Sequence, residues 1–168
     1  MSVRPDLERM RLKPDPWLAE RFGHPVYSIA GFPESVDERA WVREAVGGGD
    51  AFIYARVPAD DIGRLHLLSA EGFHVVDVAL QYGRDPAPLL STGEHEGVLV
   101  RYAKTEDYER VLDIAKSAFQ YSRFHLDPLI PKHLADEVKR AWMDSYRLGS
   151  RGEACLVATD DEEVIGFL

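Results

Sequence analysis

The 168-residue sequence predicts an α/β fold (an α+β fold with a mixed sheet), on three observations. The run VLVRYA, residues 98–103, is apolar and rich in residues that favour strands, and a helical stripe of apolar residues follows it. A second amphipathic helix and two further apolar runs then lead to Leu168. Residues 51–83 repeat the order strand, helix and strand-like run.

The first region, residues 1–84, is expected to form a half-domain of its own. Its four prolines before residue 26 limit it to short helical turns at residues 7–12 and 16–22 and a short strand at residues 26–30. Ser35 and Glu38 have the spacing of a capping box, which predicts a helix over residues 33–46. Three glycines follow this helix, and we interpret them as its end rather than as a phosphate-binding loop.

Residues 51–83 are predicted to form a strand–helix–strand unit. The run AFIYARV gives the first strand, and either Asp60 or Asp61 caps the helix. Gly72 is placed as the glycine that ends this helix, and Phe73 as the side chain that packs its end onto the sheet. The alternating run HVVDVALQYG, residues 74–83, is predicted to be the second strand. One face of the helix is expected to carry Ile62, Leu65, Leu68 and Ser69.

The second region begins after a segment rich in proline, glycine and polar residues, which predicts a linker over residues 85–97. The strand at residues 98–103 follows, and Thr105 is expected to cap the next helix. The spacing of that helix predicts one apolar stripe, formed by Val111, Leu112, Ala115, Ala118 and Phe119.

The end of the chain is predicted to form a helix and a hairpin. The helix runs over residues 131–148, and its expected inward side chains are Leu134, Val138, Ala141, Trp142 and Tyr146. Strands follow at residues 154–159 and at residues 164–168, from Val164 to Leu168. The four acidic residues between them, 160–163, are interpreted as a solvated turn rather than a cation site.

Composition excludes several classes of function. The formal net charge is −9, and acidic residues are spread over both regions, so we expect no nucleic-acid partner and no membrane surface. The N-terminus lacks an apolar leader, and the one cysteine, Cys155, lies in an apolar run and is expected to be a buried thiol. These features favour a cytoplasmic protein. The spacing of the six histidines indicates no metal site.

The segment VRYAKTEDYERVLDIAKSAFQYSRF, residues 100–124, resembles the entry to the catalytic domain of GNAT-superfamily N-acetyltransferases, where the first strand ends in an R-x-A-x-x-x-D pattern. The cluster at residues 120–124 is most similar to the branch containing TDP-fucosamine acetyltransferases. The AEGF motif at residues 70–73 resembles the late helix end of the same family. The resemblance implies an N-terminal GNAT-like half, residues 1–84, followed by the first β-α-α-β-β part of a GNAT domain, residues 98–168.

The resemblance further implies acetyl-CoA as the cofactor and a small-molecule primary amine, such as an amino sugar nucleotide, as the acceptor. In the family, a loop with an R/Q-x-x-G-x-G/A pattern holds the cofactor pyrophosphate at a helix N-terminus. No such pattern occurs up to Leu168. We therefore expect a domain truncated after its third strand, with catalytic acid and oxyanion donors outside the chain. The alternative is a non-catalytic ligand-binding or dimerisation module.

The resemblance places the acceptor-binding wall at the corner between helix and loop, which contains Gln120, Tyr121, Ser122, Arg123, Phe124 and His125. Arg123 is suited to pair with a phosphate or carboxylate, and Tyr121 and Phe124 to stack on a ring. The alternative is structural: Phe124 belongs to the core and Arg123 pairs with Asp127 or a nearby glutamate. Either His125 or His133 is a candidate proton acceptor.

One partner is predicted besides the substrate. If residues 164–168 end the sheet, their backbone groups form an open edge, and such an edge invites pairing with another chain. We therefore expect a homodimer through the strand from Val164 to Leu168.

Overall fold

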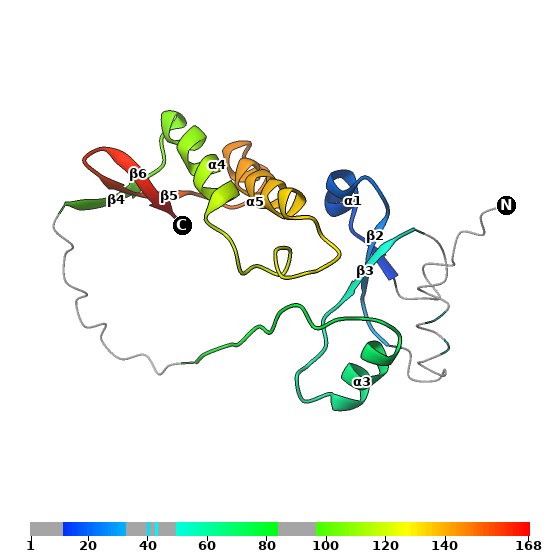
Figure 1. Ribbon diagram of the computed structural model, residues 1–168. Helices are drawn as coiled ribbons and strands as arrows, with labels where there is room; N and C mark the ends of the chain where they lie inside the picture. Colours follow the sequence, from blue (N-terminus) through cyan, green and yellow to red (C-terminus); the bar gives the residue numbers. More distant parts are fainter. Residues whose placement is uncertain (1–11, 33–39, 41–42, 44–49, 84–96) are drawn as a thin grey trace. The chain divides into compact units, whose positions relative to one another are not determined.

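The computed structural model describes residues 12–32, 40, 43, 50–83 and 97–168 (Figure 1). The chain divides into two compact units, Met1–Val78 and Ala79–Leu168. The described residues form a mixed α/β structure with two separate three-stranded sheets and four α-helices. The predicted linker lies outside the described residues, apart from Gly97.

The first unit holds a small mixed sheet with strand order β1-β2-β3. Strands β1 and β2 pair antiparallel, whereas β2 and β3 pair in parallel. Two helices accompany this sheet within the unit, and the elements in chain order are β1 (Leu12–Pro14), α1 (Pro16–Phe22), β2 (Val26–Ile29), β3 (Phe52–Ala55) and α3 (Ile62–Ala70). The predictions of α1, β2, β3 and α3 are confirmed.

The helical turn predicted up to Leu12 is wrong at that residue, because Leu12 begins strand β1. Leu12 pairs with Ile29 across the sheet, and both side chains are buried against Leu68 of α3. Burial in this small core therefore decides the local structure. The earlier part of the predicted turn lies outside the described residues.

Aspartate side chains cap the first two described helices. Asp15 accepts a hydrogen bond from the backbone N of Leu18 at 3.0 Å, and Asp61 accepts one from the backbone N of Arg64 at 3.1 Å. Of the two candidates for capping α3, Asp61 is therefore the cap. The apolar face predicted for α3 is correct at Leu68, but Ile62 is 54% exposed because it lies in the first turn, away from the core.

The end of α3 forms as predicted. Gly72 has a φ of +91°, a conformation that glycine adopts without steric cost. Phe73 packs against the core cluster of the first unit.

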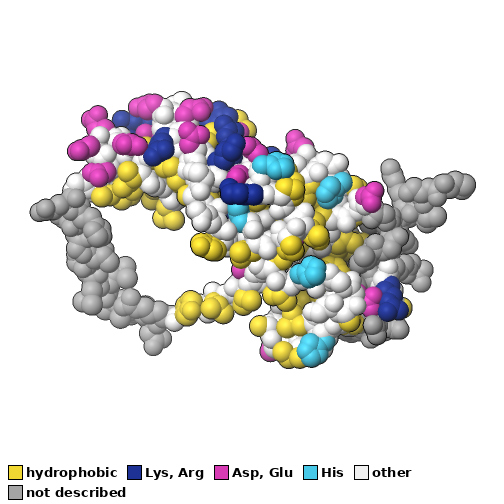
Figure 2. All heavy atoms as spheres, viewed as in Figure 1, with side chains coloured by type: hydrophobic (Ala, Val, Ile, Leu, Met, Phe, Trp, Pro, Cys, Tyr) yellow, Lys and Arg dark blue, Asp and Glu magenta, His cyan; other side chains and the backbone are white. Residues whose placement is uncertain are grey.

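The strand predicted at residues 74–83 is wrong. These residues form no ladder with another described strand, and Val75, Val78, Leu80 and Tyr82 are 61–88% exposed. Figure 2 shows apolar side chains along this extended segment. Alternation alone does not make a strand, because the backbone also needs a paired neighbour. The helix predicted over residues 33–46 lies outside the described residues, apart from Ala40 and Arg43, and the three glycines after it lie outside them as well.

The second unit is an antiparallel sheet with strand order β4-β5-β6, covered on one face by two helices (Figure 1). Its elements are β4 (Val98–Tyr102), a 3-10 turn (Thr105–Asp107), α4 (Tyr108–Ser117), α5 (Lys132–Arg147), β5 (Leu156–Asp160) and β6 (Glu163–Phe167). The two helices pack side by side. A single buried cluster joins them to the sheet, and it consists of Val111, Leu112, Ala115, Met143, Cys155, Val157 and Val164.

All of the predicted elements of this unit are present, but some details differ. Thr105 lies in the 3-10 turn, and the side chain of Asp107 makes the polar contacts at this helix start. Ala118 is exposed because α4 ends at Ser117. On α5, Val138 is buried as predicted, but Ala135, Met143 and Ser145 take the other buried positions. The other predicted inward residues, Leu134, Ala141, Trp142 and Tyr146, are partly buried, and Tyr146 packs against the buried cluster.

The acidic turn between β5 and β6 is tight. Asp161 and Glu162 have φ values of +43° and +68°, which fits a two-residue hairpin of the kind that matches strand twist. Within the described ranges, no group of three or more histidine, cysteine or acidic residues is arranged to hold a metal ion.

Candidate acceptor-binding site

The residues predicted to form the acceptor wall lie in the connection between α4 and α5, residues 118–131. This connection is ordered by its own backbone: the N–H of His125 donates to the carbonyl of Ser122 at 2.8 Å, and that of Ile130 donates to the carbonyl of Asp127 at 3.1 Å. The side chain of Ile130 is buried. These contacts tie the loop together next to the first turns of α5.

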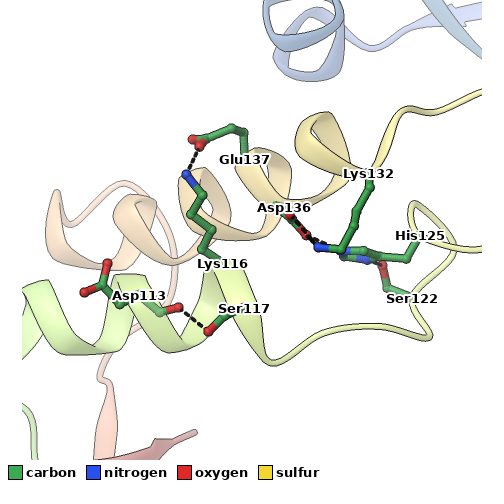
Figure 3. Close-up of polar contacts among 8 residues, drawn as sticks. All are labelled: Asp113, Lys116, Ser117, Ser122, His125, Lys132, Asp136 and Glu137. Carbon is green, nitrogen blue, oxygen red and sulfur yellow. Dashed lines mark hydrogen bonds and ion pairs between the residues drawn. The ribbon is translucent and has the colours of Figure 1, made fainter.

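A chain of three side chains ties the loop to α5 (Figure 3). Ser122 Oγ lies 2.7 Å from His125 Nδ1, and His125 Nε2 lies 3.0 Å from Asp136 Oδ1. The side chain of His125 is only 4% exposed and that of Asp136 only 14%. We call this the serine–histidine–aspartate chain. Ser122 and His125 were predicted as site residues, and Asp136 was not.

The direction of these hydrogen bonds follows from the donors available. An ionised Asp136 can only accept, so His125 Nε2 carries the hydrogen and donates it. In the neutral imidazole, Nδ1 is then an acceptor, and the hydroxyl of Ser122 donates to it. The remaining lone-pair capacity of the Ser122 oxygen is left for a group outside this chain of contacts.

Lys132 keeps Asp136 in its charged form. Its Nζ lies 2.9 Å and 2.7 Å from the two carboxylate oxygens of Asp136. Hydrogen bonding from Lys132 is the main cause that lowers the pKa of Asp136, and the hydrogen bond from His125 adds to it against the opposing effect of burial. A charged Asp136 fixes the His125 tautomer, which is the arrangement that orients catalytic histidines.

A second cluster joins the same loop to α5 through aromatic rings and cations. The guanidinium of Arg123 lies 4.7 Å from the centroid of the Phe124 ring. From α5, Lys139 Nζ lies 4.5 Å from the ring centroid of Phe119, 5.9 Å from that of Phe124 and 5.3 Å from that of Trp142. Phe124 is half-buried, so the core role considered for it is only partly correct.

The remaining predicted site residues are at the surface. Gln120 is exposed, and Tyr121 is 82% exposed. His133 is exposed as well, outside the serine–histidine–aspartate chain. Asp127, considered as a partner for Arg123, accepts from the backbone N of Leu129 at 2.9 Å. Of the two histidines considered, the structure brings only His125 into contact with other candidate side chains.

The described residues do not fit a cradle for the acetyl-CoA pyrophosphate. Such a cradle needs backbone N–H groups free at a helix start. At α1 and α3 the capping aspartates already accept from these groups, and at the start of α4 Asp107 occupies the turn. Helix α5 begins after Pro131 without a glycine-rich loop. We therefore assign no residue to the cofactor.

The fold, the serine–histidine–aspartate chain and the aromatic cluster define a mixed α/β protein with a polar loop packed against the N-terminal part of helix α5. No family model matches the chain. The chain is similar to the spore coat polysaccharide biosynthesis protein SpsD of Bacillus subtilis (strain 168), with 29% identity over 124 residues. The match covers 70% of this chain and 40% of SpsD. The similarity shows a distant relationship to a polysaccharide biosynthesis protein. Among the described helices, none is long and apolar enough to cross a membrane.

Proposed function

We propose that this chain provides the acceptor side of a GNAT-type N-acetyltransferase, which transfers acetyl from acetyl-CoA to the primary amine of an amino sugar or an amino sugar nucleotide. The observation that carries the proposal is the serine–histidine–aspartate chain, located in the loop where the family resemblance places the acceptor. The order of β4, α4, α5, β5 and β6 agrees with the first part of such a domain.

The chemistry of the loop supports this proposal. An amine is protonated at neutral pH and must lose a proton before it can act as a nucleophile. In this proposal the Ser122 oxygen takes the proton from the ammonium while its own hydroxyl proton moves to His125 Nδ1, which lies 2.7 Å away. Asp136 then stabilises the imidazolium that forms, at 3.0 Å from Nε2.

The relative supports the substrate class. SpsD is described as a spore coat polysaccharide biosynthesis protein, and such biosynthesis handles sugars. The match covers only 40% of SpsD, so any activity of the whole protein enters here as part of our proposal.

Acetyl transfer itself is the test. We would incubate this chain, and the longest natural protein that contains it, with acetyl-CoA and a panel of amino sugars, amino sugar nucleotides, amino acids and polyamines. Release of the CoA thiol and the mass of the products would be measured. We expect acetylated amino sugars or their nucleotides. Acetylation of only the amino acids or polyamines, or no acetylated product from any amine, would refute the proposal.

The second candidate is a binding or dimerisation module, and the exposed apolar face of the second sheet favours it. Val100 and Tyr102 on β4 and Ile165 on β6 are 62%, 72% and 48% exposed. Strand β6 lies at one edge of this sheet. We propose that two copies pair along this edge, and sedimentation velocity over a range of protein concentrations would test it. A monomer at every concentration would exclude dimerisation as its role.

A further inference from the structure

The hydroxyl of Ser122 has a different kind of partner from those of two nearby helix serines. Ser117 donates to the backbone carbonyl of Asp113 at 2.7 Å, and Ser145 donates to that of Ala141 at 3.0 Å. Contacts of this kind satisfy a hydroxyl within a helix. Ser122 Oγ instead lies 2.7 Å from an imidazole nitrogen. Ser122 therefore has a base within reach, which the contacts of the two helix serines do not provide.

The base is held by a contact that is shielded from water. The side chain of His125 is 4% exposed and that of Asp136 is 14% exposed, with 3.0 Å between Nε2 and Oδ1. Lys132 pairs with the same carboxylate, but its side chain is 74% exposed, so water weakens the effect of its charge. The negative charge of Asp136 therefore acts on the imidazole through the more strongly interacting, buried contact.

We propose that Ser122 is a nucleophile that takes an acyl group from carboxylic esters, which gives the chain an esterase activity. The arrangement is that of an activated serine: the hydroxyl contacts a base, and a third group orients that base. The activity needs neither acetyl-CoA nor an amine. It therefore goes beyond the proposed function and does not rest on it.

The reaction balances in two steps. Ser122 Oγ bonds to the carbonyl carbon of the ester as its hydroxyl proton moves to His125 Nδ1; the bond from that carbon to the alcohol oxygen then breaks, and the alcohol leaves with the proton. Water attacks the acyl-serine in the second step and gives its proton to Nδ1. The bond to Ser122 breaks, the serine oxygen regains a proton, and a carboxylic acid is released. Nothing is oxidised or reduced, and the only co-reactant is water.

The neighbours of Ser122 in the loop indicate the class of ester. The side chain of Tyr121 is 82% exposed, and Phe124 is partly buried two residues beyond Ser122. Aromatic side chains bind other rings by stacked or edge contacts. Ser122 itself is only partly buried, in a loop at the surface. We therefore expect small esters with a ring in their alcohol part as substrates.

The test uses p-nitrophenyl acetate as the probe, without acetyl-CoA. The wild-type chain should release p-nitrophenol in a burst, and mass spectrometry of its peptides after acid quenching should place an acetyl group on Ser122. We expect Ser122→Ala and His125→Gln each to slow acylation about 100-fold or more. The matched control is Ser117→Ala, which should keep the wild-type rate, because the hydroxyl of Ser117 donates to a helix carbonyl.

Asp136 acts in this reaction as a positioning residue, through His125. Asp136→Asn should therefore lower the maximal rate of acylation about tenfold or more and leave the ester concentration at half-maximal rate unchanged. A change in that concentration without a change in the maximal rate would show that Asp136 shapes the loop and does not orient a base.

A second probe protects the test against misfolding of a variant. A fluorophosphonate attaches to activated serines, so its attachment to Ser122 of the wild-type chain would support the inference without any substitution. Acetyl groups on lysines alone, no fluorophosphonate on Ser122, or equal acylation of Ser122 in the wild type and in His125→Gln would each overturn it.

The inference and the proposed function can fail separately. Acetylation of amino sugars by acetyl-CoA, with no acetyl group on Ser122 from p-nitrophenyl acetate, would overturn the esterase and leave the transferase in place. An acetyl group on Ser122 that depends on His125, with no amine acetylated by acetyl-CoA, would support the esterase and refute the transferase.

Discussion

Two aspartate networks differ in what their side chains can still do: one lies at the start of helix α4, and the other joins the loop after α4 to helix α5. Before the helix, Asp107 is 6% exposed and accepts from Arg101 at 2.5 and 2.9 Å and from the backbone N of Lys104 at 2.6 Å. On α5, Asp136 accepts from His125 and Lys132. Both carboxyl groups have lowered pKa values, so both networks are built on a stable negative charge.

The difference lies in the partners. Arg101 is always charged, so the network around Asp107 has no group that exchanges a proton near neutral pH. The network around Asp136 contains an imidazole and ends in a hydroxyl, which together can accept and pass on a proton. The same carboxylate chemistry thus fastens strand β4 to the start of α4 in one network and orients a candidate reactive pair in the other.

Substitution of His125 should have the largest effect. His125→Gln keeps an amide that can donate to Asp136 but removes the imidazole that would take up the proton. On the proposed function, we expect the rate of acetyl transfer to fall about 100-fold or more, the usual contribution of a general base. Single-turnover acetylation of an amino sugar would measure it.

The control for this substitution is His66→Gln, on the exposed side of α3. It should leave the rate unchanged. If both variants keep the wild-type rate, His125 only holds the loop in place, and the two aspartate networks are then alike in function.

Substitution of Asp107 should have the next largest effect. The quantity it changes is the free energy of unfolding. The hydrogen bond from Arg101 is the main cause that lowers the pKa of Asp107 to about 2. Asp107→Asn removes this charge and leaves Arg101 without its partner, so we expect the free energy of unfolding to fall by about 2 kcal/mol. Urea denaturation would measure it, with Asp113→Asn, exposed on the same helix, as the control.

The same pair predicts an acid dependence. A carboxyl group whose pKa is lower in the folded state than in the unfolded state contributes its stability above the unfolded value. That contribution should be present above a pH of about 4 and be lost as the pH falls towards 2. Asp107→Asn should lack this dependence. A parallel loss of stability with pH in both proteins would show that the pair with Arg101 is not its source.

Ser122→Ala should have a smaller effect than substitution of His125. It removes the hydroxyl that lies 2.7 Å from His125 Nδ1 but leaves the imidazole and Asp136 in contact. A water molecule at the place of the hydroxyl would take over part of its role. We expect acetyl transfer to slow about tenfold, with little change in the melting temperature. A loss as large as that of His125→Gln would show that the two residues act as one unit.

Local pattern was enough to predict most elements of the second unit. Its strands and helices have apolar stripes of clear period, and the buried residues Val111, Leu112 and Ala115 fall on the predicted face. The pattern failed at residues 74–83, because a strand also depends on a neighbour that the local sequence does not contain. It also failed at Leu12, where tertiary burial decided the conformation.

Of the candidate site, only the residues in the loop were predicted from the sequence. Ser122 and His125 lie in a short polar segment that the family resemblance singled out. Asp136 and Lys139 come from α5, and no local pattern indicated which face of that helix the loop would meet. The spacing of Lys132 and Asp136, one helical turn apart, was the available signal, but such pairs are ordinary on exposed helices.

Substitution of Arg110, in the first part of α4, should have the smallest effect. Its Nε donates to the carbonyl of Val164 on β6 at 3.1 Å, and its Nη2 lies 3.1 Å from Glu163, in a pair that is 50% and 70% exposed. Arg110→Gln should therefore lower the free energy of unfolding by no more than about 0.5 kcal/mol, against about 2 kcal/mol for Asp107→Asn.

Arg110→Gln also tests the proposed homodimer. An incoming strand at β6 would compete with Arg110 for the Val164 carbonyl, so removing the guanidinium should raise the dimer fraction in sedimentation velocity. A lower dimer fraction would place Arg110 in the contact itself. A loss of stability equal to that of Asp107→Asn would mean that the exposed pair of Arg110 and Glu163 contributes as much as the buried pair of Arg101 and Asp107. The comparison between buried and exposed contacts around α4 would then be wrong.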